Sequence, residues 1–112
     1  MTSDAARPEA PWIRAYFRKF AVRPGMYFED NRARSVYLWA LGYGWAREDL
    51  GLRRYGRGEE DLFEEFAGWL GQRTRLVDVE WIHHVEHLDP SKDNARTLFR
   101  LFQEFEEERS GR

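Results

Sequence analysis

The chain has 112 residues, a length that suits one domain and can bury a hydrophobic core without disulfides or a structural metal. It contains no cysteine, which excludes disulfides, thiol catalysis and thiolate-bound zinc, and its formal net charge of -2 gives no bulk signature of a nucleic-acid-binding protein. We find neither a signal-peptide pattern nor an apolar run of the roughly 20 residues that cross a bilayer, so we expect a cytoplasmic protein without membrane association.

Residues 1–11 contain two prolines and show no apolar periodicity, which predicts a flexible N-terminal tail. We expect a single helical domain over 12–108 and a frayed C-terminus at 109–112. The domain begins with apolar residues at helical spacing, and Arg14 and Arg18 lie on the opposite side of that helix. The apolar residues of this first helix are Trp12, Ile13, Tyr16, Phe17 and Phe20.

The first helix is followed by a turn of sequence Arg23, Pro24, Gly25, Met26 and Tyr27. Pro24 disfavours helix in the residue before it, and Gly25 has the conformational freedom that a tight turn needs. This pair is typical of a type II turn with a positive φ at the glycine. We interpret the turn as a structural corner, with Tyr27 and Phe28 packed into a ring-rich core.

A second helix is predicted over about residues 32–49, with Asp30 or Asn31 as its cap. This helix is unusually apolar, and we therefore expect it to be central in the fold. Gly42 and Gly44 lie inside it, and each weakens a helix by about 1 kcal/mol relative to alanine. They indicate either a closely packed neighbour or an irregularity in the helix.

A basic loop over 51–58 precedes a third helix that begins at the acidic residues 59–61, because acidic side chains favour helix N-termini. The predicted buried face of this helix is Leu62, Phe63, Phe66, Ala67, Trp69 and Leu70. Residues 77–88 fit a helix from about Val79, and a minor strand pair near 76–80 is the alternative.

Asp89 and Pro90 predict the start of a last helix, because they supply a cap followed by a first-turn proline. From Glu106 onward the acidic tail is expected to fray into solvent. The apolar face of this helix is Ala95, Leu98, Phe99, Leu101, Phe102 and Phe105. The predicted fold class is therefore all-α, a compact single-domain bundle of four to five helices.

Histidines near the fourth helix suggest metal binding. On a helix Glu80, His83 and His87 lie one turn apart and would share a face beside His84. The order of residues departs from the His-Glu-x-x-His signature of zinc proteases, in which the glutamate directly follows the first histidine. A small metal-binding protein or metal-dependent enzyme is therefore kept as an alternative. We expect no catalytic residue, no resident metal and no cofactor.

Arg53, Arg54 and Arg57 surround Tyr55 in the basic loop. Arginines can contact phosphates while a ring stacks on a base, as in many single-strand binders. The patch is short, and acidic residues follow it directly. A nucleic-acid-binding adaptor is thus a second alternative, and nucleic acid is not the partner that we favour.

The start of the third helix is strongly acidic, and we predict that it binds a partner. Glu60 with Glu64, and Asp61 with Glu65, are four residues apart and repel each other by a few tenths of a kcal/mol. The helix dipole offsets part of this repulsion. An anionic surface of this kind docks a basic partner and speeds its capture.

The Arg-Pro-Gly-Met-Tyr turn also carries a resemblance that extends over about residues 12–108. An aromatic helix precedes the turn, and a Gly-Tyr pair at Gly42 and Tyr43, a central Phe-rich helix, Trp81 and a Phe-rich acidic last helix follow it. In this order the chain resembles small bacterial immunity proteins of toxin-immunity gene clusters. The resemblance implies a non-enzymatic protein that neutralises a cognate toxin by direct binding.

Overall fold

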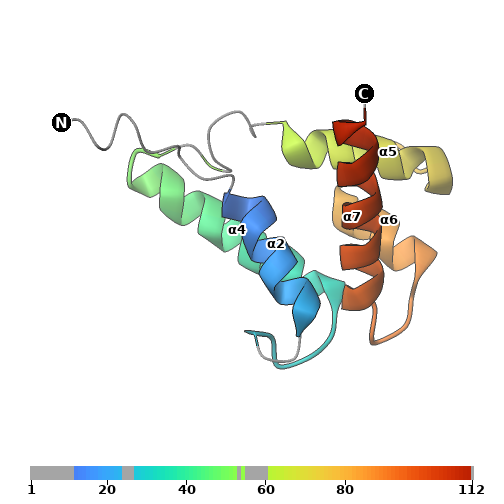
Figure 1. Ribbon diagram of the computed structural model, residues 1–112, viewed down its shortest axis with the longest axis horizontal. Coiled ribbons are helices and arrows are strands. Elements are labelled where there is room, and N and C mark those ends of the chain that lie inside the picture. Colours follow the sequence, from blue (N-terminus) through green and yellow to red (C-terminus); the bar gives the residue numbers. More distant parts are fainter. Residues whose placement is uncertain (1–11, 24–26, 53, 55–60, 112) are drawn as a thin grey trace.

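In the computed structural model, residues 12–23, 27–52, 54 and 61–111 are described. They form five helices, which are α2 (Trp12–Val22), α4 (Ala33–Asp49), α5 (Leu62–Thr74), α6 (Trp81–Leu88) and α7 (Ala95–Ser110) (Figure 1). The described residues contain no strand, so the predicted all-α bundle is confirmed and the alternative strand pair near 76–80 is not formed. None of the described helices is long and apolar enough to span a membrane.

Helix α7 is the centre of the packing, because it contacts α2, α4 and α5 (Figure 1). Its predicted apolar face is confirmed at every position, since all six residues of that face are buried. The predicted face of α5 is buried as well, apart from Ala67, which is half-buried. Helix α6 packs between α5 and α4.

Aromatic rings from four helices form the core. Phe17 of α2 lies 4.9 Å from Phe102 of α7, measured between ring centroids. In the same cluster, Phe63 of α5 stacks on Trp81 of α6 at 5.2 Å and lies 5.8 Å from Phe17. Such ring pairs add to the apolar area that each side chain buries, so they hold the helices in one arrangement.

Helix α4 is more regular than predicted. It runs without interruption through Gly42 and Gly44, so the expected irregularity is absent. Its fully buried residues are all small or β-branched, namely Ala33, Val36, Ala40 and Gly44. Tyr37, Trp39 and Tyr43 are half-buried against the core, while Leu38 and Trp45 remain exposed. Helix α4 contacts both α6 and α7, and its Trp39 and Tyr43 rings lie 5.3 and 5.6 Å from the Tyr16 ring of α2, so it packs on more than one side.

The N-terminus of α4 is bound by a residue far away in the sequence. The backbone N–H of Ala33 donates to Oδ1 of Asn94 at 2.7 Å, and the N–H of Ala95 donates to the carbonyl of Asn31 at 2.8 Å. Asp30 accepts hydrogen bonds from the Arg32 backbone N–H and the Ser35 hydroxyl. The predicted cap at Asp30 or Asn31 is therefore replaced by the side chain of Asn94, which joins the starts of α4 and α7.

The link between α5 and α6 is irregular. Arg75 ends α5 with a left-handed φ of 64°, and Asp78 has a φ of 57°. Two left-handed residues within four positions interrupt an extended backbone, which explains why no strand forms here. Helix α6 consequently begins at Trp81 instead of Val79.

Both ends of α7 differ from the prediction. The helix begins at Ala95, because the Asp89 carboxylate accepts hydrogen bonds from the Ser91 backbone and the Thr97 hydroxyl across an intervening turn. At the other end the helix continues to Ser110, and Arg109 bonds to α5. The expected fraying from Glu106 is therefore wrong for residues 106–110.

The predicted corner is seen in part. Pro24, Gly25 and Met26 lie outside the described residues, and Arg23 is exposed. Tyr27 and Phe28 contact Phe20 of α2 at 4.9 and 5.0 Å between ring centroids, yet Tyr27 remains 45% exposed. Phe28 thus packs against the core, whereas Tyr27 lies at its edge.

Candidate functional site

The acidic residues predicted to bind a partner are not equivalent in the structure. Asp61, Glu64 and Glu65 are exposed at the start of α5, and Glu60 lies outside the described residues. Glu65 accepts a hydrogen bond from Arg109 of α7 at 2.8 Å, so its charge serves an internal ion pair. No hydrogen bond or ion pair joins the Glu64 carboxylate to any other residue that the structure describes.

Glu64 lines a groove of about 600 Å³ between α4, α5 and the start of α6, which we call the acidic groove. Glu48 of α4 and Glu80, directly before α6, bring two more carboxylates to it, and Arg54 is the only cation of its described lining. Its described apolar lining consists of Ala40, Leu41, Phe63, Ala67, Val79 and Trp81. Three elements thus place negative charge around an apolar floor.

Neighbouring side chains hold two of the three carboxylates in place. The Glu48 carboxylate accepts a hydrogen bond from Arg54 at 2.8 Å. The Tyr37 hydroxyl donates to Glu80, and the Tyr37 ring lies 5.3 Å from Trp81. Glu64 is thus the carboxylate of this groove that is available to an incoming group.

The floor of the acidic groove belongs to the hydrophobic core. Phe63 and Trp81 are 7% and 4% exposed and stack on each other, so their positions are fixed by the core. A long cationic side chain can lay its methylene stem on such a floor and direct its charge to the carboxylates at the rim. The geometry therefore suits an arginine or lysine side chain better than it suits an anion.

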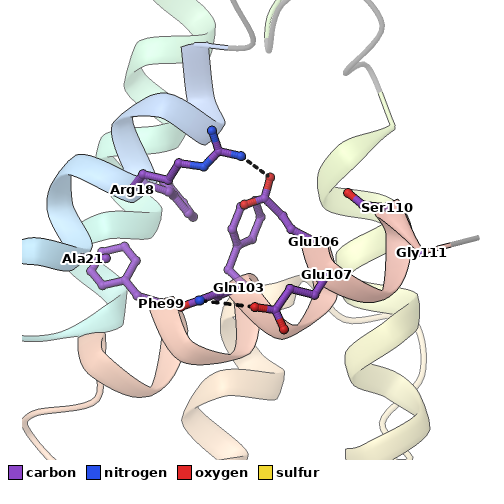
Figure 2. Close-up of a pocket in the computed structure, with 10 residues that line it drawn as sticks. Arg18, Ala21, Phe99, Gln103, Glu106, Glu107, Ser110 and Gly111 are labelled. Atoms are coloured by element: carbon purple, nitrogen blue, oxygen red, sulfur yellow. Dashed lines mark hydrogen bonds and ion pairs between the residues drawn. The ribbon is translucent and has the colours of Figure 1, made fainter.

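A second groove of about 700 Å³ lies between α2 and α7 (Figure 2). Phe17, Phe99 and Phe102 are among the residues that line it. Its polar groups bind one another, because Arg18 lies 3.6 Å from Glu106 and Gln103 donates to Glu107 at 3.3 Å, as Figure 2 shows. A ligand here would have to compete with these contacts, so we favour the acidic groove.

The predicted metal face does not form. The Glu80 carboxylate bonds to Tyr37, His84 is buried beside Thr74 with 2.6 Å between Nδ1 and Oγ1, and His83 and His87 are exposed. Across the described residues, no group of three or more histidine, aspartate or glutamate side chains is placed to hold a metal ion. Burial, followed by the charges of His83 and His87, holds the pKa of His84 below its usual value.

The basic patch is described at only one of its residues. Arg54 forms an ion pair with Glu48, with 2.8 Å between nitrogen and oxygen. Arg53, Tyr55 and Arg57 lie outside the described residues. The one described arginine therefore bonds to a carboxylate of the acidic groove, which gives no support to nucleic-acid binding.

Of the residues that line the acidic groove, the acidic run in the sequence singled out only Glu64 as a partner-binding residue. It placed Glu80 in a metal site and gave no role to Glu48 or Tyr37. Tyr37 and Glu48 lie on α4, whereas Glu64 lies on α5 and Glu80 directly precedes α6, so only the packing of these helices brings the residues together. The spacing of residues within one helix does not predict contacts of this kind between helices.

Comparison of the chain with protein-family models, with curated proteins and with solved structures finds no match. The resemblance to bacterial immunity proteins therefore remains a prediction from the sequence pattern. What the chain offers a partner has to be judged from the shape and charge of its surface.

Proposed function

We propose that this protein is a non-enzymatic binding protein that takes up a basic side chain of a protein partner in the acidic groove. The observation that carries the proposal is the meeting of Glu48, Glu64 and Glu80 over the Phe63 and Trp81 rings. The resemblance of the sequence adds a biological role, in which the partner is a cognate bacterial toxin and the protein confers immunity.

Electrostatics favours this partner. Carboxylates around a concave surface focus the field on the approach path and raise the association rate for a basic protein. An arginine can bond to a carboxylate in a bidentate manner while its flat guanidinium lies against a ring. The hot spot of such an interface would be the Glu64 side of the acidic groove, because that carboxylate loses no internal bond on binding.

The test begins with the candidate partner, which is the protein encoded beside this chain in its genome. Co-expression should rescue growth if that protein is toxic, and the two proteins should co-purify. Binding should weaken as ionic strength rises, because charges steer and hold the complex. Failure of both rescue and co-purification would refute the immunity role.

Two charge variants separate the acidic groove from general charge effects. Glu64→Lys should weaken binding of the partner about tenfold or more, since it places a cation where the basic group enters. Glu29→Lys changes the net charge equally at an exposed site outside the acidic groove and should leave affinity within about twofold. Equal effects of the two variants would rule out the acidic groove as the binding site.

An arginine-rich peptide provides an independent probe of the acidic groove. Its binding, followed by chemical-shift changes at Phe63, Ala67 and Trp81, should be lost in the Glu64→Lys variant. If the peptide binds but the encoded neighbour does not, the chemistry of the groove stands and the identity of the partner changes. If the peptide shifts no groove resonance, the groove assignment is wrong.

A further inference from the structure

Helix α4 presents an outward-facing stripe, which we call the α4 stripe. The α4 stripe consists of Arg34, Leu38, Leu41, Gly42, Trp45 and Asp49. At 3.6 residues per turn these residues share one face of the helix, opposite the buried Val36 and Ala40. Leu38 and Trp45 are 58% and 55% exposed and lie two turns apart. Large apolar side chains in this arrangement are typical of a surface that binds another helix.

Gly42 lies in the middle of the α4 stripe, where the chain itself has no need of glycine. A Cβ atom built there would meet no atom within 4 Å, and its φ is not in the left-handed region. Glycine nevertheless weakens a helix relative to alanine. What it provides is a shallow gap between Leu38 and Trp45, into which a second helix can pack closely.

The two ends of the α4 stripe carry opposite charges. Arg34 lies near its N-terminal end and Asp49 at its C-terminal end, about 22 Å apart at 1.5 Å per residue. A uniformly acidic partner helix would be repelled at Asp49. A second copy of the same helix in antiparallel orientation meets an opposite charge at both.

We infer that α4 pairs with α4 of a second copy in an antiparallel arrangement, with the two-fold axis between residues 41 and 42. With this axis, Leu38 of one copy faces Trp45 of the second copy, and Arg34 faces Asp49 of the second copy. Each contact occurs twice because of the two-fold symmetry. Gly42 lies beside the axis, where the two helices approach most closely. Hydrophobic contact, close packing and charge thus agree on one register.

Existing contacts prepare Arg34 for this role. Its Nε and Nη2 donate to Glu86 at 2.9 and 2.5 Å, which uses two of its five N–H donors and fixes the guanidinium. Asp49 of the second copy would add a carboxylate to a group that is already ordered. A single pair of helices buries less than the roughly 800 Å² per partner of a standard interface, so the dimer should be weak, in the micromolar range.

Sedimentation equilibrium and light scattering test the dimer directly. The wild-type mass should rise with concentration from 13.5 kDa toward twice that value. Leu38→Glu should weaken association at least tenfold, because it places a carboxylate against Trp45 of the second copy. Val77→Glu alters a side chain that is 79% exposed in the link before α6 and should leave the dimer unchanged. Circular dichroism and urea unfolding of each variant establish that it is folded.

Single cysteines test the register, because the chain has none of its own. Gly42→Cys should form a disulfide-linked dimer under mild oxidation, since the two cysteines lie beside the axis. Gly68→Cys is the matched control, as Gly68 is also an exposed helical glycine with open space around a built Cβ. It should stay largely monomeric.

Each outcome decides a separate point. A wild-type chain that stays monomeric at the highest concentration that remains in solution overturns the proposal. A dimer that survives Leu38→Glu places the interface elsewhere and overturns it as well. A dimer that Leu38→Glu breaks but that Gly42→Cys does not cross-link refutes the antiparallel register. None of these results depends on the basic partner of the acidic groove.

Discussion

Asn94 should be one of the most sensitive positions for stability, and Asn94→Ala tests how α4 and α7 are joined. The side chain is 5% exposed, accepts from the Ala33 N–H at 2.7 Å and donates to the Asp89 carbonyl at 3.0 Å. Alanine removes both bonds. It leaves the N–H of Ala33, a fully buried residue, without its acceptor at the first turn of α4.

The magnitude follows from these two bonds. A buried donor left without a partner costs about 1 to 3 kcal/mol, and a lost hydrogen bond about 0.5 to 1.5 kcal/mol. We expect the free energy of unfolding to fall by about 2 to 4 kcal/mol, with a drop in Tm of about 10 °C for a chain of this size. Urea unfolding followed by circular dichroism measures the change, and the m value should stay constant.

Two further variants divide the effect. Asn94→Asp retains an acceptor for the Ala33 N–H and loses the donor to Asp89, so about half of the stability loss should remain. Asn31→Ala changes an exposed neighbour whose backbone carbonyl, and not its side chain, accepts the bond from Ala95, so it should cost under about 0.5 kcal/mol. If Asn94→Ala cost no more than Asn31→Ala, the reciprocal bonding of the two helix starts would not hold α4 in place.

Three more predictions concern other parts of the fold. Because the pKa of His84 lies below its usual 6.5, the unfolded chain binds a proton that the folded chain does not, so the free energy of unfolding should fall as pH drops through 6.5 toward the lowered pKa. Urea unfolding at about pH 7.5 and about pH 5.5 should show this loss of stability in the wild type and in His83→Gln. In His84→Gln the free energy of unfolding should depend less on pH. An unchanged pH dependence in His84→Gln would assign the effect to another group. Gly42→Ala, measured on dilute protein, should raise the free energy of unfolding by about 0.5 to 1 kcal/mol, because alanine favours the helix. Gly51→Ala should lower it by about 1 kcal/mol, because the φ of Gly51 is 78°. A change of the same sign in both variants would contradict the role given to backbone conformation at these glycines. Trp69→Phe should lower the free energy of unfolding by about 1 to 2 kcal/mol, measured by thermal unfolding. The change removes the indole N–H that donates to Glu108 at 2.9 Å and weakens the stacking of Arg73, which lies 3.6 Å from the ring centroid. Glu108→Gln keeps an acceptor and should cost under about 0.5 kcal/mol, so equal losses in the two variants would point to the charge of Glu108 instead.

The parts of the fold that were predictable depend on neighbours within one helix. The faces of α5 and α7 follow from apolar residues three and four positions apart, and every predicted residue on the α7 face is buried. Helix ends were less predictable, because they depend on contacts from elsewhere. Asn94 bonds to Ala33 across 61 positions in the sequence, and Asp89 bonds to Thr97 in place of capping the helix directly.

The candidate site was predictable only where its charge is local. Glu64 belongs to an acidic run that any reading of the sequence notices, while Glu48 and Glu80 join it through the packing of α4, α5 and α6. The histidines show that local spacing can also suggest a site that the structure does not form. Their spacing suggested a shared face, but the core takes His84 inward and Tyr37 binds Glu80, so the pattern was a by-product of packing.

Helix α4 shows what apolar composition alone leaves undecided. A helix that is apolar on every side is either surrounded by its own chain or completed by another one. Here the core uses the small residues of α4 together with the Tyr37, Trp39 and Tyr43 rings, and the α4 stripe leaves Leu38 and Trp45 more than half exposed. Solvation of such residues is unfavourable by roughly 25 cal/mol for each Å² of apolar area, and no internal contact of the described chain offsets it. The proposed pairing of α4 would cover these two side chains, which is why the oligomeric state is the measurement that bears most directly on this helix.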